Sequence, residues 1–179
     1  MREVVEIFNT EEKCLIEATI LEIQDRHLRD FEEIWVPQLT ELSEEDKDLD
    51  LALKKRLSRK YDDFEVYALE CDNIAQGFIA IETLGYRSWF DEQERIIYVK
   101  FIVSAPWNRG RLRMQRYKFV GLSMLRFARQ RSTALGYSGR VGLHSLPNAI
   151  EFYRKARMLE LGSDPDFDNL IYFEFGRLE

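Results

Sequence analysis

Apolar and polar positions follow two different rhythms along the chain, and the change comes near Tyr61. From Glu11 to about Leu42 the apolar residues recur at helical spacing, and Pro37 is expected to end or kink that helix. Ser43, followed by three acidic residues, is typical of an N-cap and predicts a second helix that runs to about Lys60. The region before Tyr61 is therefore predicted to be mainly helical.

After Tyr61 the pattern is that of strands alternating with helices. The nearly continuous apolar run of residues 95–105 is typical of a central strand that is buried on both faces. A helix between two strands predicts a parallel βαβ crossover, here within an otherwise antiparallel sheet. The predicted elements are strands over 3–8, 64–70, 75–84, 95–105, 139–145 and 169–177, and helices over 117–133 and 147–157.

Composition sets the size of the fold. The chain has 179 residues, of which 45% are hydrophobic and 32% charged, which is enough for one sizeable core. One α/β or α+β domain is predicted over residues 1–179, with a helical part at 1–60 and a hairpin and core at 61–179. No apolar run is long enough to cross a membrane and the start lacks a secretory apolar region, so we expect a cytoplasmic protein. Two cysteines are too few for a thiolate metal cage, and no metal is expected.

The charges are distributed unevenly along the chain. Residues 100–158 hold thirteen Lys or Arg and a single acidic residue, Glu151, whereas residues 1–99 hold twelve basic and twenty-five acidic residues. A strongly basic segment in an acidic protein suggests a surface that binds an anionic partner. The alternative is that these arginines form ion pairs with the acidic half of the chain.

Residues 116–125, RYKFVGLSML, have the outline of a loop that leads into a helix. The backbone N–H groups of a helix N-terminus can hold an anion, and phosphate groups bind at such sites. The loop contains a single glycine, Gly121, which is fewer than phosphate-binding loops usually carry. The segment is therefore either a degenerate phosphate loop or an ordinary helix start.

A second segment makes the phosphate interpretation stronger. Residues 139–158, GRVGLHSLPNAIEFYRKARM, carry an A-x-x-F-Y-x-K pattern after a buried strand. Over roughly residues 61–176 the chain resembles the GNAT superfamily of acyl-CoA N-acyltransferases. The resemblance implies a GNAT-like mixed, mostly antiparallel sheet with a central parallel βαβ crossover, helices on both faces and two N-terminal helices. It also implies acetyl-CoA as the co-substrate, with its pyrophosphate held by the amides of an Arg/Gln-x-x-Gly-x-Gly/Ala loop.

Two placements of that loop compete. Its usual spacing from the preceding strand selects residues 109–114, whereas the glycine and the following Met124-Leu125 pair select residues 116–121, which we prefer. Phe119 then replaces the family's first glycine, so its side chain must point away from the phosphates. Basic residues in or beside the loop, including Arg113, suit phosphate oxygens. The resemblance assigns the following residues to CoA binding: Ile102, Val103, Arg109, Arg111, Arg116, Tyr117, Lys118, Phe119, Val120, Gly121 and Asn148.

The resemblance also suggests catalytic residues. Tyr153 matches the tyrosine that protonates the departing thiolate in the family, with a core aromatic as the alternative. Some members use a glutamate on the fourth strand as the general base, but this chain has Lys100 there. Glu82 on the preceding strand is the leading candidate, because burial in an apolar run would raise its pKa. His144, at the end of a strand, is the alternative base.

Three functions remain open. The first is N-acetyl transfer from acetyl-CoA to a primary amine of a small molecule or peptide. The second is a non-catalytic acyl-CoA-binding or sensing module of the same fold, and the third is nucleic-acid binding through the basic segment and its aromatic residues Trp107, Tyr117 and Phe127. The acceptor would be recognised by the leading helices and residues 84–95, whose aromatic side chains would line a pocket, cover the core or form the seam of a homodimer.

Overall fold

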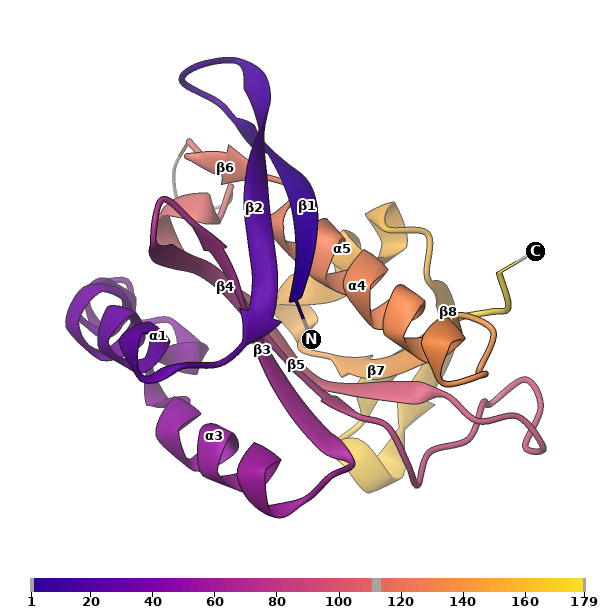
Figure 1. Ribbon diagram of the computed structural model, residues 1–179. Helices are drawn as coiled ribbons and strands as arrows, with labels where there is room; N and C mark the ends of the chain where they lie inside the picture. The colour runs from indigo at the N-terminus through magenta and orange to yellow at the C-terminus, as the bar shows by residue number, and fades with distance from the viewer. Residues whose placement is uncertain (1, 111–113, 179) are drawn as a thin grey trace. The chain divides into compact units, whose positions relative to one another are not determined.

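The computed structural model describes residues 2–110 and 114–178 and contains a mixed sheet with helices. Its strands hydrogen-bond in the order β6-β1-β2-β3-β4-β5-β7-β9-β8, and β5 and β7 run parallel (Figure 1). The strands are β1 (Arg2–Asn9), β2 (Cys14–Glu22), β3 (Phe64–Cys71), β4 (Ile74–Glu82), β5 (Ile97–Ser104), β6 (Tyr117–Lys118), β7 (Val141–Ser145), β8 (Leu159–Asp164) and β9 (Leu170–Phe175). The parallel crossover within a mostly antiparallel sheet is confirmed.

Several helices and helical turns connect these strands. The helices are α1 (Asp25–Arg29), α2 (Val36–Glu41), α3 (Leu51–Lys60), α4 (Val120–Ala134) and α5 (Ile150–Lys155), and a π-helical stretch, η1 (Asp30–Trp35), joins α1 to α2. Short 3-10 turns are η2 (Glu45–Asp48), η3 (Pro106–Asn108), η4 (Pro147–Ala149) and η5 (Pro165–Phe167). The predicted helices at 117–133 and 147–157 correspond to α4 and to η4 with α5.

The predicted long first helix is wrong in its first half. Residues 14–22 form β2, which pairs with β1 from Arg2↔Leu21 to Asn9↔Cys14 and also pairs with β3. The turn is closed locally, because the Asn9 side chain accepts the backbone N–H groups of Glu11 and Glu12. Alternating residues of β2, including Ala18 and Ile20, are buried, so the run also fits the strand period. Pairing on both edges decided between two periodicities that this short apolar run satisfies.

The helices that follow also differ from their predicted bounds. Pro37 does not end the first helix, because α2 continues to Glu41. The π-helical stretch lies directly before this proline, where the missing N–H and the bulky ring disturb the regular hydrogen-bond ladder. The next helix begins at Leu51 rather than near Ser43, and Asp50 caps it by accepting the Leu53 N–H at 2.7 Å.

The contacts divide the chain into two compact units. The first unit contains Met1–Ala80 and Phe101–Leu125, and the second contains Ile81–Lys100 and Arg126–Glu179. In the first unit, α1 to α3 cover one face of β3 and β4, where Phe31 and Trp35 pack against Phe78 (Figure 1). On the other face, Gly77 lets the first turn of α4 approach, since a Cβ there would lie 2.9 Å from Val120. This unit therefore has helices on both faces of its strands.

The second unit contains β7, β8 and β9 with α5. Tyr153 of α5 packs on Phe173 of β9, with ring centroids 5.6 Å apart. A cluster of Ile96, Tyr98 and Tyr172 is buried together with aromatic neighbours. Strand β8 was not predicted, because its sequence LELGSD has only two apolar residues, which are followed by a glycine and two polar residues.

Candidate functional site

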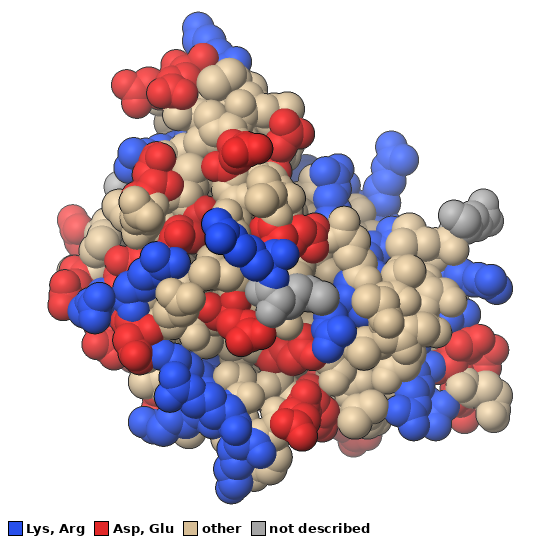
Figure 2. All heavy atoms as spheres, viewed as in Figure 1, with Lys and Arg blue, Asp and Glu red and all other residues tan. Residues whose placement is uncertain are grey.

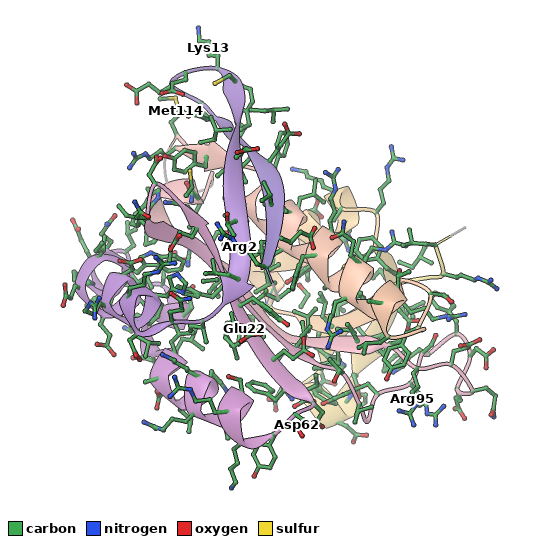
Figure 3. The ribbon with its side chains drawn as sticks, in the orientation of Figure 1. Arg2, Lys13, Glu22, Asp62, Arg95 and Met114 are labelled. Atoms are coloured by element: carbon green, nitrogen blue, oxygen red, sulfur yellow. The ribbon has the colours of Figure 1, made fainter. Side chains whose placement is uncertain are left out.

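The loop before α4 is held in place by strand pairing. Strand β6 pairs with β1 through Phe8↔Lys118 and Asn9↔Tyr117, and Thr10 donates its N–H to the Arg116 carbonyl at 3.1 Å. Figure 3 shows Lys13 at the tip of the β1–β2 hairpin and Met114 at the neighbouring start of this loop. The hairpin that replaced the predicted helix thus fixes the approach to α4.

The N-terminus of α4 presents backbone donors. Its first hydrogen bond runs from the Ser123 N–H to the Phe119 carbonyl at 2.8 Å. The N–H groups of Val120, Gly121 and Leu122 precede that bond and have no acceptor within the helix. Such a set of N–H groups at the positive end of a helix can bind an anion.

Phe119 has the backbone conformation that a glycine adopts at no cost. Its φ is 71°, in the left-handed region that non-glycine residues rarely occupy. The side chain is 51% exposed, and its ring meets that of Phe8 on β1 edge to face with centroids 6.4 Å apart. The side chain therefore leans on the β1 strand, and the backbone turn into α4 is kept without a glycine.

Arg109 is engaged inside the first unit. Its guanidinium pairs with Glu44 at 2.6 Å and with Asp46, and it donates to the Ser104 carbonyl at 3.0 Å. These partners raise the pKa of Arg109 above its ordinary value, against the effect of burial. The charge is therefore neutralised by the protein itself, which disfavours the placement of the phosphate loop at residues 109–114. Arg111 and Arg113 lie outside the described residues.

The next three residues have different environments. Tyr117 is buried, and its hydroxyl donates to Asp72 at 3.1 Å while its N–H donates to Asn108 at 3.0 Å. Arg116 and Lys118 stand over the rings of Tyr117 and Phe8, and neither has an acidic partner among the described side chains. Tyr117 is thus a structural anchor, and Arg116 and Lys118 are the cations that remain beside the start of α4.

The remaining CoA-binding candidates lie elsewhere. Ile102 and Val103 are half-buried on β5, and Val103 packs against the core of the first unit. The parallel ladder includes the pairs Ile97↔Val141 and Tyr98↔Gly142, and β5 continues to Ser104. Asn148 is exposed on η4.

Tyr153 of α5 is buried. No hydrogen-bond partner of its hydroxyl is found in the part of the chain that the structure describes, residues 2–110 and 114–178. Every fully buried side-chain N or O atom of the described residues does have a partner. The hydroxyl is therefore not completely enclosed, and burial raises the pKa of Tyr153 above its ordinary value. A protonated phenol with a free donor suits a general acid.

Glu82 is an ion-paired carboxylate. It lies 3.6 Å from the ammonium of Lys100, which also donates to the Tyr86 hydroxyl at 3.4 Å. The side chain of Glu82 is partly exposed, so the expected apolar burial is not present. The lysine that occupies the family's glutamate position thus holds the alternative carboxylate.

His144 has a partner on each ring nitrogen. Its Nε2–H donates to Asp164 at 3.0 Å, and its Nδ1 accepts the Tyr98 hydroxyl at 2.7 Å. Burial lowers the pKa of His144, while Asp164 raises it. Neither Tyr98 nor Asp164 was predicted, because Tyr98 sits in an apolar strand and Asp164 ends the strand that the sequence pattern missed. In the sequence, only the acidic character of Asp164 itself could have indicated a partner for His144.

The loop at residues 84–95 is anchored by a buried carboxylate. Glu174 of β9 is fully buried and accepts the Ser88 hydroxyl, the Trp89 N–H at 3.0 Å and the Tyr172 hydroxyl at 3.1 Å. The exposed Trp89 ring stacks on Tyr172 with centroids 4.3 Å apart. The loop expected to meet the acceptor is therefore fixed beside the His144 cluster.

On the face shown in Figure 2 the charges do not form one basic surface. Arg109 pairs with Glu44 and Arg140 pairs with Glu94 at 3.1 Å, so pairing with the acidic half is confirmed for these two arginines. Lys and Arg side chains lie among Asp and Glu side chains over the face shown in Figure 2. Tyr117 and Phe127 are buried, so their rings cannot stack on bases, and the partly buried Trp107 packs edge to face on Trp35. Two of the three aromatic residues expected to contact nucleic acid therefore belong to the core.

Two further searches of the described residues gave negative results. No group of His, Cys, Asp and Glu side chains within residues 2–110 and 114–178 could hold a metal ion. None of the helices described in those ranges is both long and apolar enough to cross a membrane.

Solved structures provide the comparison that sequences do not. No protein-family model and no curated protein sequence matches this chain. The GNAT domain of S. lividans PAT matches with a TM-score of 0.65 and 13% identity over 97% of this chain and 96% of that chain. PaiA N-acetyltransferase from Thermoplasma acidophilum, in complex with coenzyme A, matches with a TM-score of 0.61 and 13% identity over 89% and 98% of the two chains.

A third structure gives the same result. A GNAT family acetyltransferase from Listeria monocytogenes matches with a TM-score of 0.61 and 12% identity over 97% of this chain and all of that chain. At these identities the likeness concerns the fold, and it extends over nearly the full length of each chain. Together with the parallel β5–β7 pair and the strand order, it shows that this chain has the fold of the GNAT acetyltransferases.

Proposed function

We propose that the protein is an N-acetyltransferase that moves an acetyl group from acetyl-CoA to a primary amine of a small molecule or peptide. The observation that carries this proposal is the left-handed Phe119 directly before the N–H donors of α4, within a fold that acetyltransferases share. A backbone turn of this kind presents amides to a pyrophosphate. Arg116 and Lys118 add positive charge beside it.

The chemistry assigns a role to Tyr153. The amine nitrogen attacks the thioester carbonyl, a C–N bond forms, and the C–S bond breaks to release the CoA thiolate. Tyr153 gives its proton to that thiolate: its raised pKa keeps the phenol protonated until the thiolate forms, and its hydroxyl has no hydrogen-bond partner among the described residues. The amine must lose a proton before or during attack, and Glu82 and His144 are the candidate acceptors of that proton.

Binding of CoA is the first test. We expect isothermal titration calorimetry to give a Kd for CoA, and we expect Gly121→Asp to weaken binding at least about tenfold because its carboxylate repels the phosphates. Gly121→Asn is the matched control, since it has the same size without the charge. Equal affinities of the two variants would place the phosphates elsewhere, and no binding of CoA to the wild type would refute the proposal.

Release of thiol from acetyl-CoA over a panel of primary amines tests the chemistry. Tyr153→Phe should lower turnover about 100-fold or more, with the affinity for CoA unchanged. Tyr137→Phe is the control, because it removes a tyrosine hydroxyl that only bonds the Thr83 carbonyl in the same unit. Turnover that survives in Tyr153→Phe would remove the acid assignment.

A non-catalytic acyl-CoA sensor is the second candidate. Two observations favour it: Phe119 replaces the first glycine, and Lys100 occupies the base position and pairs with Glu82. In this case CoA binds, but no amine in the panel releases thiol from acetyl-CoA.

A further inference from the structure

We propose that Tyr98, His144 and Asp164 form a proton relay that takes up the proton of the acceptor amine. This inference rests on the proposed acyl transfer and assigns the base that the transfer needs. Tyr98 is the group that exchanges a proton with the amine, and His144 and Asp164 act through it.

The three residues form one continuous chain of hydrogen bonds within the second unit. They come from β5, β7 and β8, and the contacts are 2.7 Å from Tyr98 to Nδ1 and 3.0 Å from Nε2 to Asp164. An ionised Asp164 accepts only, so Nε2 carries the proton and the Nδ1 lone pair receives the Tyr98 hydroxyl. A hydroxyl, an imidazole and a carboxylate in this order activate nucleophiles in hydrolases by the same logic.

The relay is shielded from water. Tyr98 is 4% exposed, and the side chains of His144 and Asp164 are 5% and 13% exposed. Phe167 lies flat on the imidazole with centroids 4.0 Å apart and planes 4° apart. The tyrosine hydroxyl as the second partner of the imidazole is the feature that a purely structural histidine does not need.

The groups around the imidazole leave it neutral and able to accept a proton. The titratable or charged groups that face it are Tyr98 and Lys100 from β5, Asp164 from β8 and Tyr172 from β9. Burial and the Lys100 charge lower the pKa of His144, whereas Asp164 raises it and stabilises the imidazolium once it forms. The Phe167 and Trp89 rings contribute no titratable group.

The proton transfer through the relay is balanced. Tyr98 transfers its hydroxyl proton to Nδ1 of His144 as it takes one proton from the ammonium of the acceptor. The products are a neutral amine, an intact Tyr98 phenol and a His144 imidazolium paired with the Asp164 carboxylate.

The hydrogen bonds of the relay can be tested by NMR without any acceptor. The chain has only two histidines, so their imidazole signals are easily assigned. Long-range proton–nitrogen spectra of the full chain should show His144 with Nε2 protonated, and the signal lost in His144→Gln provides the assignment. Tyr98→Phe should raise the pKa of His144, because a donor to Nδ1 stabilises the neutral ring, and Asp164→Asn should lower it. The pKa of His27 should be the same in all of these variants. The control variant Tyr137→Phe should leave the pKa of His144 unchanged. An unaltered pKa of His144 in Tyr98→Phe would overturn the relay.

Steady-state kinetics test whether the relay takes part in catalysis. The acidic limb of kcat/KM against pH should report His144, so it should move to lower pH in Asp164→Asn. Tyr98→Phe should lower kcat about 100-fold or more and leave the Kd of CoA unchanged. If the wild type releases thiol and both Asp164→Asn and Tyr98→Phe keep its pH profile, the relay is wrong. The acetyltransferase proposal would still stand. Loss of CoA binding by the wild type would instead refute the proposed function.

Discussion

The two histidines of the chain, one in each compact unit, both have side chains with little exposure to solvent and the same kind of acidic partner. His27 is fully buried and donates from Nε2 to Glu70 at 3.0 Å, and His144 is nearly buried and donates from Nε2 to Asp164 at the same distance. They differ at the other nitrogen. Nδ1 of His27 accepts the backbone N–H of Gln24 at 3.1 Å and closes a capping box on α1, whereas Nδ1 of His144 accepts the Tyr98 hydroxyl.

That second partner separates a structural histidine from a chemical one. A backbone N–H cannot be given up, so His27 can only stabilise the start of its helix. A phenol can exchange its proton, so His144 is connected to whatever lies beside Tyr98. Burial and a carboxylate partner by themselves do not identify a functional histidine.

Replacing each histidine by glutamine tests the difference between them, and we expect the largest effect on kcat here. We expect His144→Gln to lower kcat about 100-fold or more, because the relay loses its proton acceptor. His27→Gln should leave kcat per folded molecule unchanged and reduce the free energy of unfolding by about 1–3 kcal/mol, because Glu70 loses its buried donor. Thiol-release kinetics and urea unfolding measure the two effects. Similar losses of kcat in both variants would mean that the histidines do not differ in role.

Alanine substitution of one strand glycine in each unit compares how tightly the two units are packed around these strands. A Cβ on Gly142 would lie 2.1 Å from the Tyr172 hydroxyl and 2.7 Å from Ile96, so Gly142→Ala should destabilise the protein by about 1–3 kcal/mol. At Gly77 a Cβ would meet the flexible end of Met124 and also Cγ1 of Val120 at 2.9 Å, so Gly77→Ala should destabilise the protein by about 1–2 kcal/mol, less than Gly142→Ala.

Urea unfolding measures both changes. Gly176→Ala is the control, because nothing lies within 4 Å of its added Cβ. A larger loss at Gly77 than at Gly142 would mean that the packing of α4 is the tighter of the two.

Stability should fall as the pH is lowered through the range of histidine titration. The pKa of both His27 and His144 is lowered, and burial is the largest cause in each case. The unfolded chain therefore binds these protons near pH 6.5, before the folded chain does. The stabilisation is present above that pH and is lost as the pH falls toward the folded-state pKa values, by up to about 1.4 kcal/mol per pH unit for each proton.

Unfolding free energies between about pH 7.5 and pH 5.5 measure this dependence. His144→Gln should remove part of the slope and keep the part that belongs to His27. A slope that survives in full would assign the pH dependence to other groups.

Phe119 gives the smallest and most local effect. Phe119→Ala keeps the left-handed strain and loses the Phe8 contact, so it should lower stability by about 1 kcal/mol. Phe119→Gly also loses the contact but relieves the strain, and we expect it to be more stable than the alanine variant by about 1 kcal/mol. Thermal unfolding measures the difference. Equal stability of the two variants would contradict the left-handed conformation.

Much of the fold was predictable from local patterns. The β3–β4 hairpin, the apolar β5, the helix that follows Phe119 and the crossover to β7 all have patterns whose periodicity only one element satisfies. Residues 14–22 fit both a helix and a strand, and the choice was made by β1 and β3. Strand β8 has too few apolar residues to be predicted, and Asp164 was missed with it.

The sequence by itself determined where helices and strands alternate after Tyr61, where a loop leads into α4, and which tyrosine sits on α5. Only the tertiary structure decided that Arg109 serves Glu44 and Asp46, that Phe119 takes a glycine conformation, and that His144 lies between Tyr98 and Asp164. The physical reason is range. Periodicity and capping act over a few neighbouring residues, whereas the partners of a buried charge or imidazole come from strands that are distant in the sequence and meet only in the folded sheet.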